Sequence, residues 1–182
     1  MVKPNFQRGA TLIEALVTLV IVAFGLLGLA GLQSRMQASE MEAYQRSQAL
    51  ILLDDMANRI AINRRAAGSY VTGSPVGNGT CPSDSGSRQQ IDAAEWCNAL
   101  QGAAEVSGSS KMGAVIGGRG CVEDMGNNEY LVTVAWQGLV PISAPPDGVP
   151  CGKSLYDAAG TPCDNDRCRR TVTTLVRIGS LS

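Results

Sequence analysis

Cysteine is the residue type in this sequence whose chemistry is easiest to interpret. The chain has 182 residues, six of them cysteine, and it contains no histidine. All the cysteines lie after residue 80, in the part richest in turn-forming residues: Cys81, Cys97, Cys121, Cys151, Cys163 and Cys168. An even number of cysteines in a loop-rich segment indicates disulfide bonds formed in an oxidising compartment. Zinc binding is the competing interpretation, but neither a Cys-x-x-Cys spacing nor a histidine ligand supports it.

The pairing of these cysteines is open at the level of sequence, because six cysteines allow many connectivities. We favour a bond between Cys81 and Cys97, which would tie a Gly- and Ser-rich connection to a short helix. If the strands that begin near Cys121 and Cys168 both flank one central strand, they begin at the same end of the sheet. The expected pairs are therefore Cys81–Cys97, Cys121–Cys168 and Cys151–Cys163.

No enzymatic site is expected in this chain. Without histidine, a Ser-His-Asp or Cys-His site and a histidine-based zinc protease motif are all impossible. The segment Gly117–Gly120 (GGRG) resembles a phosphate-binding loop only superficially, because it precedes a strand and lacks a Gly-Lys-Ser/Thr ending. Asp164-Asn165-Asp166 could offer oxygen ligands to calcium, but it lacks the full loop with its closing glutamate. We interpret these two segments as turns, and we expect no cofactor and no metal.

The charge of the chain argues against general binding to nucleic acid. The formal net charge is −1 and the isoelectric point is near 5.4, so no basic field covers the molecule. Arg167, Arg169 and Arg170 nevertheless form a local basic cluster. Either these arginines are solvated charges at the start of a strand, or they contact an acidic partner or DNA.

The amino-terminal part combines a short basic leader with a long apolar run. Lys3 and Arg8 precede residues 10–32, which are apolar apart from two threonines and Glu14. A helix of this length, at about 1.5 Å per residue, spans roughly 35 Å and can cross a hydrocarbon core of about 30 Å. Basic residues before such a helix keep the amino end in the cytoplasm. The cysteines then lie on the opposite, oxidising side.

Glu14 is the most informative residue of the apolar run. A carboxylate one turn inside an apolar helix costs on the order of 3 kcal/mol and is seldom kept without a partner. If the chain were cut between Gly9 and Ala10, the new amino group of Ala10 would lie one helical turn before Glu14, on the same face. That amine could neutralise Glu14 in the same chain or in a neighbour. The alternative is an ordinary single-pass anchor whose Glu14 stays solvated at the headgroups.

The segment Arg8-Gly9-Ala10-Thr11-Leu12-Ile13-Glu14 resembles the prepilin cleavage signature of type IV pilins and type II secretion pseudopilins. In that family a prepilin peptidase cuts after the glycine and methylates the new amine, and the glutamate brings each subunit into register with its neighbour. The resemblance implies that Gly9 is the cleavage residue, Ala10 the N-methylated terminus and Glu14 the assembly carboxylate. Ala10 stands where major pilins usually have phenylalanine, which fits a minor subunit better.

Three glycines, Gly25, Gly28 and Gly31, lie where many members of that family have a proline. Glycine is a poor helix former, at about 1 kcal/mol relative to alanine, so these residues could loosen the helix in a filament. Close packing of helices in the bilayer is the other interpretation.

After residue 32 the pattern becomes amphipathic, without a helix breaker before Gly68. The apolar positions that recur at helical spacing are Ala49, Leu52, Leu53, Met56 and Ile60. This stripe should pack on a globular domain. The pairs Glu42 with Arg46 and Asp55 with Arg59 have i, i+4 spacing and are expected on outer faces.

The remaining residues predict a small mixed domain. Residues 68–90 are a Gly/Ser/Pro-rich connection, and residues 91–105 resume helical spacing, with Asp92 expected as the cap. Segments that alternate with period two predict strands, at residues 120–123, 130–136 and 171–178. A turn is expected at 125–128, and the long loop 138–170 should be stapled by cysteines. The fold class is α+β and similar to type IV pilins: a long N-terminal helix packed on a small antiparallel β-sheet with a disulfide-stapled loop.

The resemblance also implies an organisation and a location. The segments are a leader at 1–9, a transmembrane helix at 10–32, an amphipathic helix at 33–66 and an extracytoplasmic domain at 67–182. The expected place is the inner membrane, single pass, with the amino end cytoplasmic and the domain periplasmic, and then the pilus after assembly. The expected partners are the prepilin peptidase, other minor pilins, the major pilin and the inner membrane.

Weaker similarities point to one class of pilin. Four segments resemble PilV-type minor pilins, which prime assembly of type IV pili and contribute to twitching motility: the opening Ile13–Val17, the run Gly25–Gln33, the stretch Asp55–Asn63 and the strand Tyr130–Trp136. Two alternatives stay open. The chain could be a minor pseudopilin of type II secretion, or a pilin that serves cell adhesion or binds DNA through its stapled loop.

Overall fold

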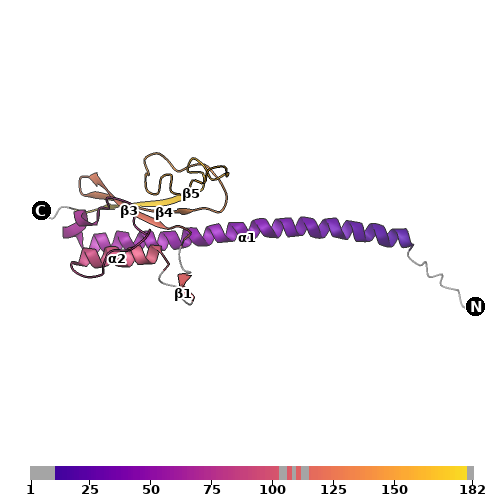
Figure 1. Ribbon diagram of the computed structural model, residues 1–182, viewed down its shortest axis with the longest axis horizontal. Coiled ribbons are helices and arrows are strands. Elements are labelled where there is room, and N and C mark those ends of the chain that lie inside the picture. Colours follow the sequence, from indigo (N-terminus) through magenta and orange to yellow (C-terminus); the bar gives the residue numbers. More distant parts are fainter. Residues whose placement is uncertain (1–10, 103–105, 108–109, 112–114, 180–182) are drawn as a thin grey trace, which may run out of the picture. The chain divides into compact units, whose positions relative to one another are not determined.

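The computed structural model describes residues 11–102, 106–107, 110–111 and 115–179 (Figure 1). The chain divides into two compact units, Met1–Met41 and Glu42–Ser182. The helices are α1 (Leu12–Ile62), the 3₁₀ helix η1 (Arg64–Tyr70) and α2 (Arg88–Leu100). The strands are β1 (Val106–Ser107), β2 (Ser110–Lys111), β3 (Arg119–Gly126), β4 (Glu129–Gln137) and β5 (Arg169–Arg177).

Helix α1 is long and apolar enough in its first part to cross a membrane, and no residue of that part is buried within the described chain. The expected amphipathic helix runs to residue 66, but α1 ends at Ile62. Asn63 leaves helical geometry with φ −94° and ψ 40°, and the chain then tightens into η1. Residues Ala67 and Tyr70 of η1 lie in the core. The change from α1 to η1 after Ile62 therefore positions these two side chains for burial.

The second unit is built on a three-stranded antiparallel sheet of order β3-β4-β5. A two-residue turn, Asn127-Asn128, joins β3 to β4, and both residues have positive φ, at 53° and 60°. This is the geometry of a type I′ hairpin, whose twist matches that of the strands it joins. The predicted turn at 125–128 and all the predicted strands are present, and each strand is longer than expected.

The two faces of the sheet have different covers. Alternate residues of β4, Val132, Val134 and Trp136, face the second half of α1, which lies along the sheet in Figure 1. The predicted stripe on α1 is confirmed, because each of its members lies in the same core: Ala49, Leu52, Leu53, Met56 and Ile60. The opposite face of the sheet has its own small cluster around Cys121 and Ala135.

Trp96 of α2 fills the centre of the main core. Its indole N–H donates to the carbonyl oxygen of Leu52 at 2.8 Å, so the ring is packed against α1 and its polar atom is satisfied. Gly120 of β3 lies directly against the ring. A Cβ at position 120 would overlap the Trp96 ring and would come within 2.7 Å of Leu100 Cδ1. The glycine is therefore required by the close approach of α2 to the sheet.

The start of α2 differs from the prediction. The helix begins at Arg88 and not at residue 91, and Ser87 caps it: the Ser87 side chain accepts from the Gln90 amide while the Gln90 side chain accepts from the Ser87 amide. This capping box already satisfies the first turn. The sequence predicted Asp92 as the cap, and this prediction is wrong. Asp92 is a buried residue in the second turn of α2.

Asp92 joins three helices through one carboxylate. Its side chain is 2% exposed and accepts from Arg59 Nη1 of α1 at 2.7 Å, from Arg88 Nη2 of α2 at 2.9 Å and from the Tyr70 hydroxyl of η1 at 2.5 Å. The predicted pair of Asp55 with Arg59 is also present, at 2.9 Å. Burial opposes the charge of Asp92, but the Tyr70 hydroxyl and the two guanidinium groups hold its pKa below the usual value.

We expect Asp92→Asn to lower the free energy of unfolding by about 2 kcal/mol, because the Tyr70 hydroxyl and the Arg88 guanidinium lose a charged acceptor, whereas Arg59 keeps its pairs with Asp55 and Glu95. Urea unfolding at pH 7 measures this, with the fluorescence of Trp96 and Trp136 as the signal, since both rings are buried. Asp54→Asn is the control for the change from aspartate to asparagine, because Asp54 is exposed on α1, the helix that carries Arg59, and its effect should stay within about 0.5 kcal/mol.

The effect of Asp92 should also depend on pH. Its pKa is lowered in the folded chain, so its contribution to stability is present above the ordinary aspartate pKa of about 4 and is lost as the pH falls through the lower folded value. The difference between the wild type and Asp92→Asn should therefore shrink below about pH 4. Equal stability of the two proteins at pH 7 would contradict this account of the cluster.

Candidate functional site

The first part of α1 presents an apolar surface with one charged group. All side chains from Thr11 to Leu32 are exposed, including Ile13 and Phe24, each at 71%. Glu14 lies in the first turn, where its carboxylate interacts favourably with the positive end of the helix dipole. Its amide donates to the Thr11 carbonyl at 3.0 Å, which closes this turn. Such a surface suits lipid or other apolar helices.

Gly9 and Ala10, the expected cleavage and methylation residues, lie outside the described residues. The expected pairing of the Ala10 amine with Glu14 therefore stays a prediction. Within the described part of the chain, no basic group pairs with the Glu14 side chain. The carboxylate is thus available to a partner.

The glycines of the apolar run leave α1 intact. The helix passes through Gly25, Gly28 and Gly31 without a break, and a Cβ at any of them would meet nothing within 4 Å. Their lack of a side chain is not needed for packing inside this chain. Loosening of the helix in a filament and close approach of another helix both stay predictions.

Three disulfides staple the second unit, and only one of them is the expected pair. The structure joins Cys81 to Cys97, as we favoured, with their Cα atoms 5.6 Å apart. The other two predicted pairs are wrong. The bonds in the structure are Cys121–Cys151 and Cys163–Cys168.

The strands have the order that the prediction assumed, but that order keeps Cys121 and Cys168 apart. Cys121 lies on β3, and Cys168 directly precedes β5, so β4 separates them. Two strand spacings amount to roughly 10 Å, beyond the Cα separation of about 6 Å that a disulfide bridges. The long loop instead folds back over the outer face of the sheet and brings Cys151 to Cys121, with Cα atoms 5.9 Å apart.

Arg169 holds this loop on the sheet. Its guanidinium is 2% exposed and donates to the carbonyl oxygens of Val149 at 2.7 Å and Cys151 at 3.0 Å. Tyr156 packs beside it, and its hydroxyl donates to the carbonyl of Gly117 at 2.9 Å. Burial raises the pKa of Tyr156 well above its usual value. The loop is therefore a packed layer with its own polar bonds.

For two of the three arginines in the basic cluster, both interpretations of the sequence are wrong. Arg169 and Arg170 are buried and bonded within the chain, so neither is a solvated charge or a contact for DNA. Arg167 alone of the three is exposed. The reason is that a folded loop needs donors for its buried carbonyl groups, and arginine supplies several from one side chain.

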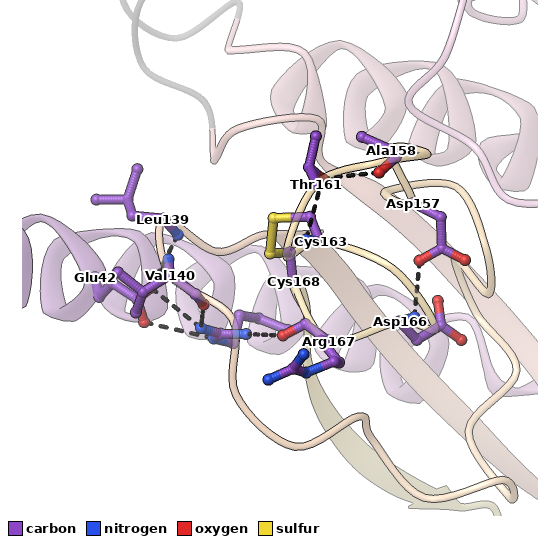
Figure 2. Close-up of a disulfide and its surroundings, with 11 residues drawn as sticks. Glu42, Leu139, Val140, Asp157, Ala158, Thr161, Cys163, Asp166, Arg167 and Cys168 are labelled. Atoms are coloured by element: carbon purple, nitrogen blue, oxygen red, sulfur yellow. Dashed lines mark hydrogen bonds and ion pairs between the residues drawn. A yellow bond between two sulfur atoms is a disulfide. The ribbon is translucent and has the colours of Figure 1, made fainter.

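The segment Asp164–Asp166 forms the polar turn that we expected. Asn165 and Asp166 have positive φ, at 53° and 61°. Asp166 is engaged within the chain: its carboxylate accepts from the Ser154 amide at 2.7 Å and pairs with Arg169 at 3.2 Å. The amide of Asp166 donates to the Asp157 side chain, as Figure 2 shows. The carboxylate oxygens of Asp166 therefore form bonds that hold the loop together.

Glu42 at the other end of the packed part of α1 binds the same loop (Figure 2). Its Oε1 accepts from the amides of Leu139 at 2.9 Å and Val140 at 3.4 Å, and it pairs with Arg170 at 3.2 Å. The expected pair with Arg46 is not formed, because the carboxylate turns toward the loop. Arg170 also donates to the Val140 carbonyl at 2.5 Å. One carboxylate thus ties the loop to α1.

The comparison with family models finds the prokaryotic N-terminal methylation motif over residues 4–30. The motif indicates a type IV pilin or pseudopilin. It spans Gly9, Ala10 and Glu14 and much of the exposed apolar helix, although it covers only a small part of the chain. The comparisons with curated proteins and with solved structures find no match to this chain.

The remaining observations fit a pilin-like chain. A long N-terminal apolar helix whose later part packs on a three-stranded antiparallel sheet, with disulfides, is consistent with a type IV pilin-like α+β fold. The leader motif implies processing by a prepilin peptidase and assembly with other pilins. The apolar helix with this leader fits an inner-membrane anchor.

Sequence reasoning missed the ionic contacts of this pilin-like domain. Glu42 and Arg170 are 128 residues apart, and Arg59 and Asp92 are 33 apart, so no local pattern signals either pair. The capping box was detectable, because Ser87 and Gln90 have its spacing. The helical periodicity drew attention to Ile91 instead.

We expect Glu42→Ala to speed hydrogen exchange at the amides of Leu139 and Val140 by about tenfold or more, since hydrogen bonds to a charged group contribute about 1.5–3 kcal/mol. Hydrogen-exchange NMR of the full chain in detergent micelles measures this. Glu40→Ala is the control, because Glu40 is exposed on the same helix two residues earlier. Unchanged exchange at both amides in Glu42→Ala would show that this carboxylate does not hold the loop.

Proposed function

We propose that this chain is a minor pilin that helps to prime type IV pilus assembly, with a place at the pilus tip. One observation carries the proposal: an exposed apolar helix whose single charged group, Glu14, lies one turn after the cleavage site that the motif indicates. An apolar helix of this kind leaves the bilayer only if other apolar helices replace the lipid. A filament with a core of such helices meets that condition.

The proposed step is a cut between Gly9 and Ala10 followed by methylation of the new amine. Hydrolysis of that peptide bond creates a cation within one turn of Glu14, and a methylated amine keeps its positive charge. The amine of one subunit and Glu14 of its neighbour then neutralise each other in an apolar setting. Pairing offsets a cost on the order of 3 kcal/mol for the unpaired carboxylate, and it sets the axial register between subunits.

The minor role rests on Ala10 and on the similarity to PilV-type minor pilins. Residues 67–182 would then form the exposed extracytoplasmic part, and the disulfides there suit an oxidising compartment. A minor pseudopilin of type II secretion is the second candidate, because the methylation motif is common to both classes. Deletion of the gene distinguishes them: loss of pili and twitching supports the pilus, and loss of substrate secretion supports the secretion system.

We expect the mature protein to begin at Ala10 with a methylated amine. Mass spectrometry of the amino-terminal peptide from sheared surface filaments measures this. In a strain without prepilin peptidase, the protein should keep Met1 and should stay in the membrane fraction. Assembled material that begins at Met1 would overturn the proposed route.

We expect Glu14→Ala to be cleaved and inserted normally but to be strongly depleted from the sheared filament fraction. The loss of an interaction of about 3 kcal/mol corresponds to roughly a hundredfold weaker association. Immunoblots of membrane and sheared fractions, together with twitching assays, give the readout, and Glu40→Ala is the control. Wild-type recovery of Glu14→Ala in filaments would show that this carboxylate has no role in assembly.

A further inference from the structure

The outer face of the sheet is only half covered by the stapled loop. Cys151 and Tyr156 lie over the end of the sheet near Cys121 and Ala135. At the other end, Glu123, Leu131 and Leu175 form a row of directly paired residues across β3, β4 and β5. Leu175 is 39% exposed. This end of the face therefore remains open within the described chain.

A pocket lies at the edge of the loop, beside Glu123. It has a volume of about 150 Å³, and its walls are the segment 72–75, Pro150 and the Cys121–Cys151 disulfide. We call it the Glu123 pocket. Sites for small-molecule ligands usually measure about 300–1,000 Å³, so this pocket suits a single side chain.

The walls of the Glu123 pocket are held in place. The segment 72–75 is bonded to β3, since the Thr72 amide donates to the Val122 carbonyl at 2.9 Å and Val76 forms a two-way bridge with Gly120. The facing wall is fixed by the disulfide. The pocket is thus formed before any ligand binds, which lowers the entropic cost of binding.

Glu123 is a half-buried carboxylate without a counter-charge. No hydrogen bond or ion pair engages its side chain within the described residues, whereas Glu42, Asp92 and Asp166 each bind an arginine. Burial raises the pKa of Glu123, so the protein around it does not compensate its charge.

The basic side chains nearest along this face are already engaged. Arg119 lies on the same face of β3, but its guanidinium donates to the carbonyls of Gly77 at 3.1 Å and Gly118 at 2.8 Å. Arg177 at the open end of β5 pairs with Glu129 at 2.7 Å. No basic side chain of the described residues pairs with Glu123, so a partner can supply the cation.

We propose that the Glu123 pocket receives the ammonium end of a lysine side chain from a partner protein. A lysine brings a compact charge on a long apolar stem, and the stem fits between Pro75 and Pro150. Ser74 also lines the pocket, and its hydroxyl can accept a further hydrogen bond. Leu131 and Leu175 extend the contact across the sheet, where the surface around that lysine can rest.

The chemistry of the pocket is tested by NMR titration of the full chain in detergent micelles. The probe is N-acetyl-lysine methylamide, and N-acetyl-norleucine methylamide is its uncharged counterpart. The lysine probe should shift the amides of Thr72, Gly73 and Glu123 at concentrations at least fivefold lower than the norleucine probe. Equal binding of the two probes would overturn the proposal, because it would show an apolar surface without a cation site.

Variants of the chain complete this test. Glu123→Gln keeps the shape and removes the charge, so it should weaken the lysine probe at least fivefold. Glu123→Asp keeps the charge but places the carboxylate one methylene group farther from the pocket, so it should weaken binding of the lysine probe by an intermediate amount. Asp124→Asn is the matched control: it makes the same charge change at the next residue, which is exposed, and it should leave binding unchanged. Binding that is indifferent to Glu123→Gln would overturn the site.

A cross-linking experiment tests for the protein partner. A water-soluble carbodiimide activates a carboxylate and joins it to an adjacent lysine amine as an amide, with the carbodiimide converted to a urea. Membrane and surface fractions of producing cells are treated, and the cross-linked peptides are sequenced by mass spectrometry. A peptide that joins Glu123 to a lysine of another chain supports the proposal. Recovery of Glu123 peptides without such a link would overturn the protein partner.

Discussion

The ion pair between Arg59 and Asp92 is the interaction on which the packing of the second unit depends most. It places a charge pair at one end of the apolar stripe of α1, and Tyr70 and Arg88 join the same carboxylate. Glu42 with Arg170 forms a second pair near the other end, about 26 Å earlier along the helix. Between them lie four buried apolar residues of α1: Ala49, Leu52, Leu53 and Met56. Removing one partner of such a pair costs more than the pair contributes. The first pair therefore fixes α1 against α2, and the second fixes α1 against β5.

Each of two disulfides holds a different irregular segment of the second unit in place. Cys81–Cys97 fastens the long connection before α2, and Cys121–Cys151 fastens the loop over the outer face of the sheet. A small three-stranded sheet buries little surface on that face, so the loop needs both the disulfide and the buried guanidinium of Arg169 to stay in place. This arrangement leaves half of the outer face uncovered. The same constraint that stabilises the loop therefore creates the edge at which the Glu123 pocket lies.

The two parts of α1 are suited to different surroundings, and their residue types show this difference. From Thr11 to Leu32 the helix is apolar on all sides and exposed within the chain, whereas from Ala49 to Ile60 only one stripe is apolar and it is buried. A helix that is apolar all round needs lipid or other helices, and a helix with one stripe needs a domain. The proposed role of an assembling subunit needs both kinds of surface in one element. The surface that is left unsatisfied is the surface available to other subunits.

The sequence by itself determined the features that depend on neighbours along the chain. Periodicity predicted α1 and its stripe, alternation predicted β3, β4 and β5, and the placement of Gly9, Ala10 and Glu14 predicted a pilin-like leader. The tertiary structure alone decided the features that depend on distant residues. The choice of Cys151 as the partner of Cys121 followed from the path of the loop over the outer face of the sheet. The burial of Asp92, Arg169 and Arg170 followed from the carbonyl groups and charged groups that the fold brings to them. Local patterns report which face of an element is apolar, but the partner of a charge or a thiol is set by the path of the chain.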